Sequence, residues 1–471
     1  MHLKKNYFDL AKYSFLFLWL FIASCNNEKI EDTKTYFGGK IKNPREQFVY
    51  FFKDEKVIDS AKIENSRFLF ELKSLENGLY TFKHGPEFQY LYLEPQDSLL
   101  LYLNTWNFDE TINFSGKGSR KNNFLINLFL KQEEIEKLNH DTFHLDQYDF
   151  AARIDSITAS LVMEYEKLVE AENEEPSEFF KKLAEVAIYY PGYAKMEYFP
   201  MKHRDQNENY DHPEVSDDFY SYRSKVDLND ESLINYATYS YYIKTFLYNQ
   251  AFEKEMRDST KNNFSLNFME AAKENIKSEK IRNMLLASGF WTSVSAFNMN
   301  PEQTKEVEDF FFAHCTDEKY IAEAKQVINQ RNLLKNGDSL PFLRTYNINK
   351  EHQDIKKLIR NKNAVIYFWP KEEGIQELLV ESLHEMHEKY PEIIFIGIER
   401  EKSYDEWTHF VKSRKLPAHL QYRIDKTCAS YPLFEGDMAR TLILDKGLIM
   451  NNYLLFNDSY TLEKNLALLK K

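Results

Sequence analysis

The chain has 471 residues, of which 43% are hydrophobic and 15% aromatic, so more than one well-packed domain is expected. Its formal net charge is −13, which argues against a nucleic-acid-binding protein because such proteins present a basic face. The sequence contains no Gly-x-Ser-x-Gly elbow, dinucleotide fingerprint or calcium loop, so we predict no cofactor.

The first 24 residues have the pattern of an export signal. Three lysines within the first 12 residues precede the apolar run Tyr13–Ile22, which is too short to span a bilayer. The run leads into Ile22-Ala23-Ser24-Cys25, which resembles the processing box of bacterial lipoproteins. The resemblance implies cleavage before Cys25 and attachment of diacylglycerol to its sulfur. An ordinary secretory signal followed by a chance cysteine is the alternative.

The residue after this cysteine bears on the destination of the chain. It is Asn26, whereas lipoproteins of this kind that stay in the inner membrane are associated with Asp there. The resemblance therefore implies a palmitate-type lipid anchor in the cell envelope, in the outer membrane of a Gram-negative bacterium and facing an unassigned side. Several acyl chains would hold the protein durably. The membrane is thus the first expected partner, and residues 25–36 are expected to form a charged tether.

Residues 37–118 are predicted to form an antiparallel β-sandwich. Apolar runs recur about every ten residues and are separated by turn signals such as Asn77-Gly78 and Gly85-Pro86. The expected strands are 48–52, 57–63, 68–72, 79–83, 88–93, 99–103 and 111–114. The arrangement resembles an uncharacterised domain common in lipoproteins of the Bacteroidota. Gly116-Lys117-Gly118-Ser119 lacks the spacing of a phosphate-binding loop, so we expect a turn there.

Residues 119–335 are predicted to be helical, since they combine few glycines with dense Glu and Lys. Asn300-Pro301 is a good helix start, and Asn336-Gly337 is expected to close the last helix. Seven residues, 236–242, include four tyrosines. Packing in the core or between domains is the expected role of these rings, and ligand stacking, as in a carbohydrate-binding module, is the alternative.

A strand, a turn and a helix follow one another in the region 336–471. Ala364–Phe368 is an apolar run, Trp369-Pro370 breaks it, and apolar residues at helical spacing follow. This pattern resembles the active-site entry of TlpA-like periplasmic thioredoxin-fold proteins, which place Cys-x-x-Cys after Phe-Trp and three further residues. The cysteine positions of that motif fall on Glu373 and Gln376. The resemblance implies a thioredoxin-like α/β domain, and the fold class is therefore a multidomain α+β protein.

Further landmarks of the same resemblance follow in order. A buried strand is expected at 393–398, a helix with Trp407 at 401–412, and a hairpin at 442–449. The family's cis-proline position falls on Ala439, so the Met438–Ala439 bond is expected to be trans. A binding groove would be lined by Trp369, Pro370 and Met438.

The redox chemistry of the family requires an attacking thiolate and a resolving thiol. Neither Glu373 nor Gln376 supplies one, and Cys428, expected in a helix, has no neighbouring cysteine. We expect Cys315 and Cys428 to be buried free thiols, with a disulfide between them as the alternative. Glu373 either favours the start of the helix or belongs to a groove for a peptide or protein partner of unknown identity.

Two histidines, His384 and His387, are one residue short of the metalloprotease spacing, so a solvated helix face is expected and no metal site is predicted. The predicted function is accordingly non-catalytic binding or scaffolding at the envelope. The rival prediction is a thiol–disulfide oxidoreductase of the TlpA-like family, active in cell redox homeostasis. No catalytic residue is assigned.

Overall fold

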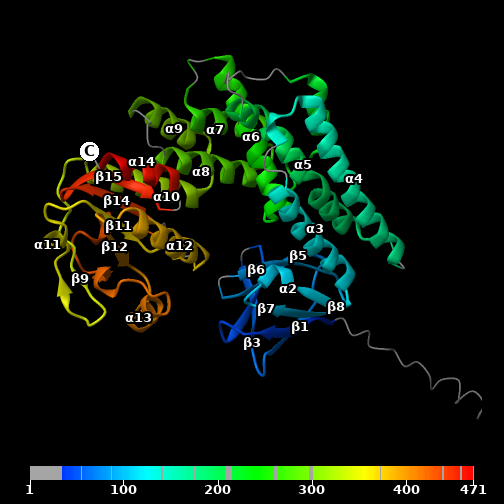
Figure 1. The fold of residues 1–471 in the computed structure, drawn as a ribbon, viewed down its shortest axis with the longest axis horizontal. Coiled ribbons are helices and arrows are strands. Elements are labelled where there is room, and N and C mark those ends of the chain that lie inside the picture. Colours follow the sequence, from blue (N-terminus) through cyan, green and yellow to red (C-terminus); the bar gives the residue numbers. More distant parts are fainter. Residues whose placement is uncertain are drawn as a thin grey trace, which may run out of the picture.

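A computed structural model describes residues 34–54, 56–85, 87–138, 142–172, 175–206, 215–258, 260, 262–295, 301–371, 373–436, 440–456 and 459–469. The chain combines β-sheets at both ends with a long helical region between them (Figure 1). Across these ranges, every helix is too short or too polar to cross a bilayer. The predicted export signal and Cys25 lie outside the described residues.

Two four-stranded sheets follow the N-terminal end and enclose one hydrophobic core. Their orders are β4-β1-β7-β8 and β3-β2-β5-β6. All neighbours pair antiparallel except β1 and β7, which are parallel. The strands are β1 Lys34–Lys42, β2 Phe48–Lys53, β3 Lys56–Lys62, β4 Arg67–Lys73, β5 Gly78–His84, β6 Glu87–Leu93, β7 Ser98–Asn104 and β8 Asn113–Lys117, with the short helix α2 Phe108–Thr111 before β8.

Strand β1 was not predicted, and its first three residues fall in the segment expected to be a tether. The signal was hidden by Gly38-Gly39, because glycine weakens a strand pattern and marks a close approach of backbones. A Cβ atom at Gly39 would lie 2.1 Å from the carbonyl oxygen of Leu101 on β7. The expected turn at 116–119 is also wrong in detail: Gly116 and Lys117 end β8, and helix α3 begins at Ser119.

The middle region is helical, as predicted, and buries the largest core of the chain. Side-chain caps begin several of its helices: Asp146 accepts the backbone N–H of Tyr148 and Asp149, and Asp317 caps the last helix in the same way. The helices are α3 Ser119–Leu138, α4 Gln147–Ala171, α5 Glu178–Gln206, α6 Ala237–Arg257, α7 Phe264–Asn275, α8 Glu279–Ser295, α9 Pro301–His314 and α10 Glu318–Leu333, with a 3₁₀ segment at Asp217–Lys225.

Several details of this region test the sequence predictions. Helix α9 begins at Pro301, as expected, whereas α10 ends before Asn336-Gly337, which lies in the following turn with a φ of +89° at the glycine. Tyr239 and Tyr242 are buried in the core, which confirms the packing role for these two rings, whereas Tyr241 is 53% exposed. Tyr236 instead packs edge-on against Tyr90 of β6 at a centroid distance of 5.3 Å and so joins the helical region to the sandwich.

Helix α5 contains two prolines, and one of them is compensated by a neighbouring helix. Pro191 has no N–H to donate to the carbonyl of Ala187 one turn earlier. Gln132 of α3 donates its side-chain amide to this carbonyl oxygen at 2.7 Å. The contact explains how a proline is tolerated within a helix of 29 residues.

The C-terminal region forms a seven-stranded mixed sheet in the order β10-β9-β13-β12-β11-β14-β15. Strands β11, β12 and β13 are parallel to one another, and the remaining neighbours pair antiparallel. The elements are β9 Thr345–Tyr346, β10 His352–Gln353, α11 Ile355–Ile359, β11 Ala364–Phe368, α12 Glu373–Lys389, β12 Ile394–Glu399, α13 Tyr404–Ser413, β13 Gln421–Ile424, β14 Arg440–Asp445, β15 Leu448–Leu455 and α14 Ser459–Leu469.

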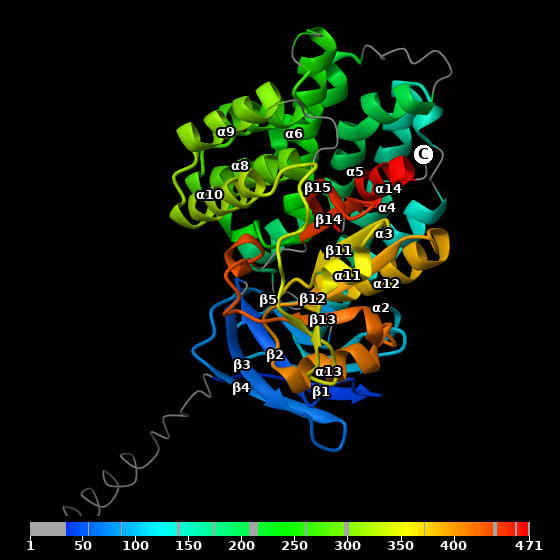
Figure 2. The ribbon, with the colours of Figure 1, turned by 90° about the vertical axis from the view of Figure 1, so that its left-hand side faces the viewer.

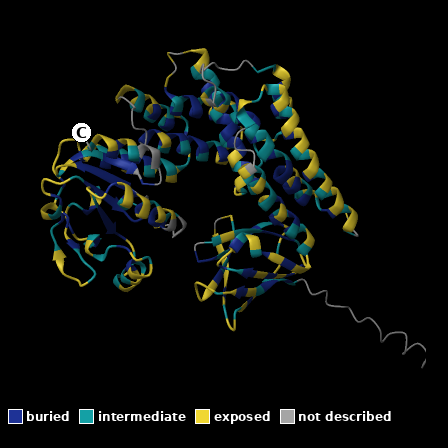
Figure 3. Ribbon diagram, in the orientation of Figure 1, coloured by how far each residue is buried: buried dark blue, intermediate teal, exposed yellow. Residues whose placement is uncertain are grey.

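This sheet is covered on both faces, which is why its central strand has no alternation. All five residues of β11 are buried, and Figure 3 shows the central strands of this sheet in the dark blue of buried residues. Val365 and Tyr367 pack in one core with residues of α12, α13 and α14, whereas Ile366 and Phe368 pack in another with α11 and the loop around Phe434. The predicted strands, the helix with buried Trp407 and the hairpin β14–β15 are confirmed.

Strand β15 and the segment before β14 meet the helical region at a polar joint. Gln330 of α10 donates to the backbone carbonyls of Pro432 and Glu435, and Arg440 donates to Gln330 at 3.3 Å. Asn452 donates to carbonyls at the end of α10. Figure 2 shows α10 beside the loop that precedes β14. These contacts attach the edge of the seven-stranded sheet to the helices.

Candidate functional site

The carboxyl end of β11 is the candidate site, because the chain passes there from a buried strand through Trp369-Pro370 into α12. Both residues of this dipeptide are buried. Gln376, in the first turn of α12, is 2% exposed and donates its amide N–H to the carbonyl oxygen of Pro370 at 2.5 Å. The glutamine thus closes the turn that it follows, at a position that the sequence analysis compared with the second cysteine of the family motif.

A second buried amide fixes the indole ring of Trp369. The ring donates its N–H to Oε1 of Gln421 on β13 at 3.1 Å, and Nε2 of Gln421 donates to the hydroxyl of Tyr367 at 2.8 Å. Burial raises the pKa of Tyr367 above its ordinary value of 10, so the phenol stays neutral. The indole also packs edge-on against Phe410 of α13 at 5.0 Å. Its orientation is therefore set from three neighbouring elements.

A buried guanidinium lies directly after β12. Arg400 is 2% exposed and donates to the backbone carbonyl oxygens of Trp369 at 3.1 Å and Phe434 at 3.0 Å. One carboxylate oxygen of Glu399 accepts the backbone N–H groups of the three residues that follow it. The contacts hold the loop after β12 and the segment before β14 against the turn after β11. Sequence reasoning missed both residues, although a charged pair directly after a buried strand was a usable signal.

The structure describes some of the predicted site and groove residues and not others. Trp369, Pro370 and Gln376 lie together at the end of β11. Glu373 is the first residue of α12, and its side chain is not described. Met438 and Ala439, and with them the predicted trans bond, lie outside the described residues.

The two remaining thiols are free, buried and on different parts of the fold. Cys315 lies in the core of the helical region, where burial raises its pKa. The expected helix around Cys428 is wrong: this residue lies in a turn between β13 and the 3₁₀ segment at Tyr431–Leu433, where Asp425 and its neighbours close a tight loop. Its sulfur lies 3.2 Å from the hydroxyl oxygen of Ser430.

The two histidines on α12 differ in their surroundings: His384 is exposed, as expected of a solvated helix face, whereas His387 is half-buried and makes structural contacts. Nδ1 of His387 lies 2.7 Å from the carbonyl oxygen of Leu383, and its ring packs against Phe395. In the part of the chain that the structure describes, no group of three or more His, Cys, Asp or Glu side chains is arranged to hold a metal ion.

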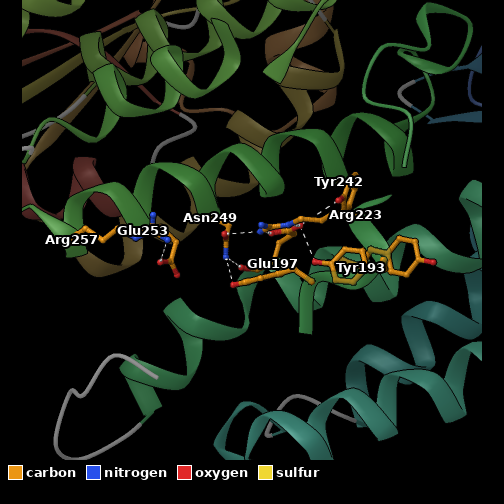
Figure 4. Close-up of polar contacts among 9 residues, drawn as sticks. Tyr193, Glu197, Arg223, Tyr242, Asn249, Glu253 and Arg257 are labelled. Carbon is orange, nitrogen blue, oxygen red and sulfur yellow. Dashed lines mark hydrogen bonds and ion pairs between the residues drawn. The ribbon is translucent and has the colours of Figure 1, made fainter. Parts of the chain in front are cut away.

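A second buried polar cluster lies in the helical region (Figure 4). Glu197 of α5 has a fully buried side chain, which accepts hydrogen bonds from Arg223 at 2.9 Å, from Tyr222 at 2.8 Å and from Tyr242 at 3.3 Å. Arg223 also donates to Asn249 of α6 at 2.9 Å. The hydrogen-bond partners of Glu197 lie on the 3₁₀ segment at 217–225 and on α6, so the cluster joins these two elements to α5.

The arrangement of the C-terminal sheet defines the class of this region. It contains a parallel strand–helix–strand unit and, later in the chain, a β-hairpin and a final helix. The helix after β11 begins at the carboxyl edge of the sheet. This is the arrangement of a thioredoxin-like domain. No protein-family model matches the chain, and no curated protein matches it in sequence.

Solved structures are similar to less than a third of the chain. They include a candidate thiol-disulfide oxidoreductase of Bacteroides vulgatus, with 15% identity, 30% of this chain and 99% of that chain covered, and a TM-score of 0.26. The thioredoxin domain of a thiol-disulfide oxidoreductase from the same organism has 14% identity, coverage of 28% and 98%, and a TM-score of 0.25. A thiol:disulfide interchange protein of a Bacteroides species has 12% identity, coverage of 28% and 90%, and a TM-score of 0.25.

Proposed function

We propose that this protein is a lipid-anchored component of the cell envelope whose thioredoxin-like domain binds a protein or peptide partner without thiol–disulfide exchange. The observation that supports this proposal most directly is the hydrogen bond made by the side chain of Gln376. Its side chain holds the carbonyl of Pro370 in the turn that would otherwise present a cysteine pair. A resolving thiol is absent at that place, so a mixed disulfide could not be released from it.

Reduction of insulin disulfides by the purified chain tests the proposal. We expect no turnover above the rate of the thiol reductant alone. A variant with Glu373→Cys and Gln376→Cys supplies the matched positive control, because it restores the motif at the same helix start. Turnover by the unmodified chain that is abolished by Cys428→Ser would refute the proposal.

The rival function, a thiol–disulfide oxidoreductase, has one observation in its favour. The pKa of Cys428 lies below its ordinary value of 9, because the hydrogen bond with Ser430 and the nearby Arg344 outweigh the opposing effect of burial. A lowered pKa increases the thiolate fraction. However, Cys428 is buried, and the other cysteine that the structure describes, Cys315, is a free thiol in the core of the helical region. Alkylation by iodoacetamide at neutral pH separates the two functions: the binding protein reacts slowly, and a redox enzyme would react at once.

The lipid anchor is proposed from residues 22–25 and needs its own test. Cells that express the full chain are labelled with palmitate, and the protein is recovered from membranes. We expect label on the natural chain and none on Cys25→Ala, which should leave the membrane fraction. Equal labelling of both would refute the anchor and would leave the proposal about the thioredoxin-like domain untouched.

A further inference from the structure

The outward face of the sheet β4-β1-β7-β8 has an unusual composition for so acidic a protein. The strand register places one set of side chains on this face, opposite the buried Phe37, Phe70 and Leu101. Six basic residues belong to the outward set and only one acid, Glu71. The basic residues are Lys34, Lys40, Lys42, Arg67, Lys73 and Lys117. A chain with a net charge of −13 therefore carries a positively charged sheet face.

The centre of the same face is apolar and exposed. Leu69, Leu100 and Tyr102 are 59%, 52% and 44% exposed. Gly38 lies between the two leucines in the register and is covered by Leu69, since a Cβ atom there would lie 2.9 Å from the leucine Cδ1. Because Gly38 has no side chain, the side chain of Leu69 can lie over the backbone at the centre of the face. An apolar centre with a basic rim is the pattern of a surface that binds another surface.

The short distance in sequence between Cys25 and strand β1 favours a membrane as the surface that this face binds. Strand β1 belongs to this sheet and begins at Lys34, nine residues after Cys25. Nine residues span at most about 30 Å when fully extended, so an anchor at Cys25 would keep this end of the sandwich close to the bilayer. Strands β1 and β4 also lie at the end of the molecule away from α6 and α9 (Figure 2), and the exposure of the face means that no other part of the described chain covers it.

We propose that the outward face of the sheet β4-β1-β7-β8, centred on Leu69 and Leu100 and edged by Lys40, Lys73 and Lys117, docks on a bilayer surface that contains anionic phospholipid. The lysines attract the headgroups, and the leucines and Tyr102 enter the boundary between headgroups and acyl chains. The inference rests on the proposed lipid anchor, because that anchor would bring the membrane close. The affinity for anionic phospholipid, however, comes from the side chains of this face.

Vesicle sedimentation with the chain from Asn26 onward tests the face without any acyl chain, because every described residue is retained. The probes are vesicles of phosphatidylcholine alone and of phosphatidylcholine and phosphatidylglycerol in equal parts. We expect binding to the anionic vesicles that weakens as salt is added. Each basic side chain at an anionic surface strengthens binding about fivefold, so the triple change Lys40→Glu, Lys73→Glu and Lys117→Glu should weaken it about 100-fold or more.

The matched control carries the same charge change on exposed lysines elsewhere: Lys137→Glu, Lys280→Glu and Lys319→Glu. It should bind nearly as the natural chain does. A second pair of variants separates the apolar contribution: Leu69→Ser with Leu100→Ser should weaken binding, and Met163→Ser with Leu378→Ser, which are equally exposed, should not. Circular dichroism verifies that all four variants keep their fold.

Three results would overturn the proposal. The first is equal binding by the two charge variants, the second is no preference for anionic vesicles, and the third is binding to soluble polyphosphate without binding to vesicles, which would assign the face to a polyanionic polymer. None of these results depends on Cys25. Failure of the lipid anchor is recognised separately by the palmitate-labelling experiment.

Discussion

Replacement of Glu197 by alanine should destabilise the helical region more than any exposed ion pair can. The carboxylate of Glu197 is fully buried, and the side chain of Arg223 is 25% exposed. Removing the carboxylate removes an acceptor that the guanidinium shares with two tyrosine hydroxyls, and leaves the positive charge with the neutral amide of Asn249 as its acceptor. Breaking a buried pair from one side costs about 3–5 kcal/mol, because the remaining charge is desolvated and uncompensated.

Thermal unfolding followed by circular dichroism measures this loss. A region of about 200 residues loses about 2–4 °C in Tm per kcal/mol, so we expect Glu197→Ala to lower the Tm of the helical signal by about 10 °C. Glu197→Gln should lie between alanine and the natural residue, since the amide oxygen can still accept the hydrogen bond from Tyr222. The matched control is Glu164→Ala, which removes a half-exposed partner of Lys131 and should cost at most about 1 kcal/mol.

A double-mutant cycle then isolates the pair. The variant with both Glu197→Leu and Arg223→Leu should lose less stability than the two single changes together, by about 2 kcal/mol, because it leaves no unpaired charge in the core. The reasoning would be refuted if Glu197→Ala cost no more than Glu164→Ala, or if the two leucine changes were additive.

Three further predictions concern the sandwich and the thioredoxin-like domain. Burial and neighbouring carboxylates raise the pKa of Asp109 to about 6, so its charged form opposes folding. The contribution of Asp109 to stability is fully present below about pH 4 and is lost as the pH rises through 6. Asp109→Asn should remove this loss and add about 1 kcal/mol at pH 7 in urea titrations, and an unchanged pH profile would contradict the prediction. Gln421→Leu deprives the Trp369 indole and a buried phenol of partners and should cost about 2–4 kcal/mol by urea unfolding; a neutral effect would mean that the amide is dispensable. Gly39→Ala should prevent β1 from pairing with β7 and abolish hydrogen-exchange protection in the sandwich, whereas Gly78→Ala on β5, where a Cβ atom would meet first the terminal nitrogen of the flexible Lys53 side chain, should keep it.

The sequence predicted the elements whose signals are local. The strand at Ala364–Phe368 is a continuous apolar run and was located within one residue. The hairpin expected at 442–449 has two such runs around an Asp-x-Gly turn, and the turn was located, but β14 begins two residues earlier and β15 continues six residues further, to Leu455. Strand β1 was missed because two glycines interrupt its pattern at the point where another backbone approaches. The local hydrophobic pattern therefore fails to predict a strand where contact with a distant part of the chain determines which residue type fits.

The candidate site was predictable only in part, for the same reason. Trp369 and Pro370 are adjacent in sequence and were identified together. The groups that orient them, Gln421 and Arg400, come from β13 and from the loop after β12, and nothing in a single sequence pairs them with the turn. Cys428 was placed in a helix that does not exist, because the segment between β13 and β14 holds a turn closed by Asp425.

These contacts also explain how the turn after β11 is held without a thiol. Two side-chain amides, an indole and a guanidinium bond backbone carbonyls or one another there. None of these bonds involves sulfur, so the geometry of the turn is supported without a thiol. Gln376 donates a hydrogen bond there, whereas a thiol would donate only weakly. The carboxyl edge of the sheet is thus held by side-chain bonds, and the proposed binding function would gain from this, because a preorganised surface loses less conformational freedom when a partner binds.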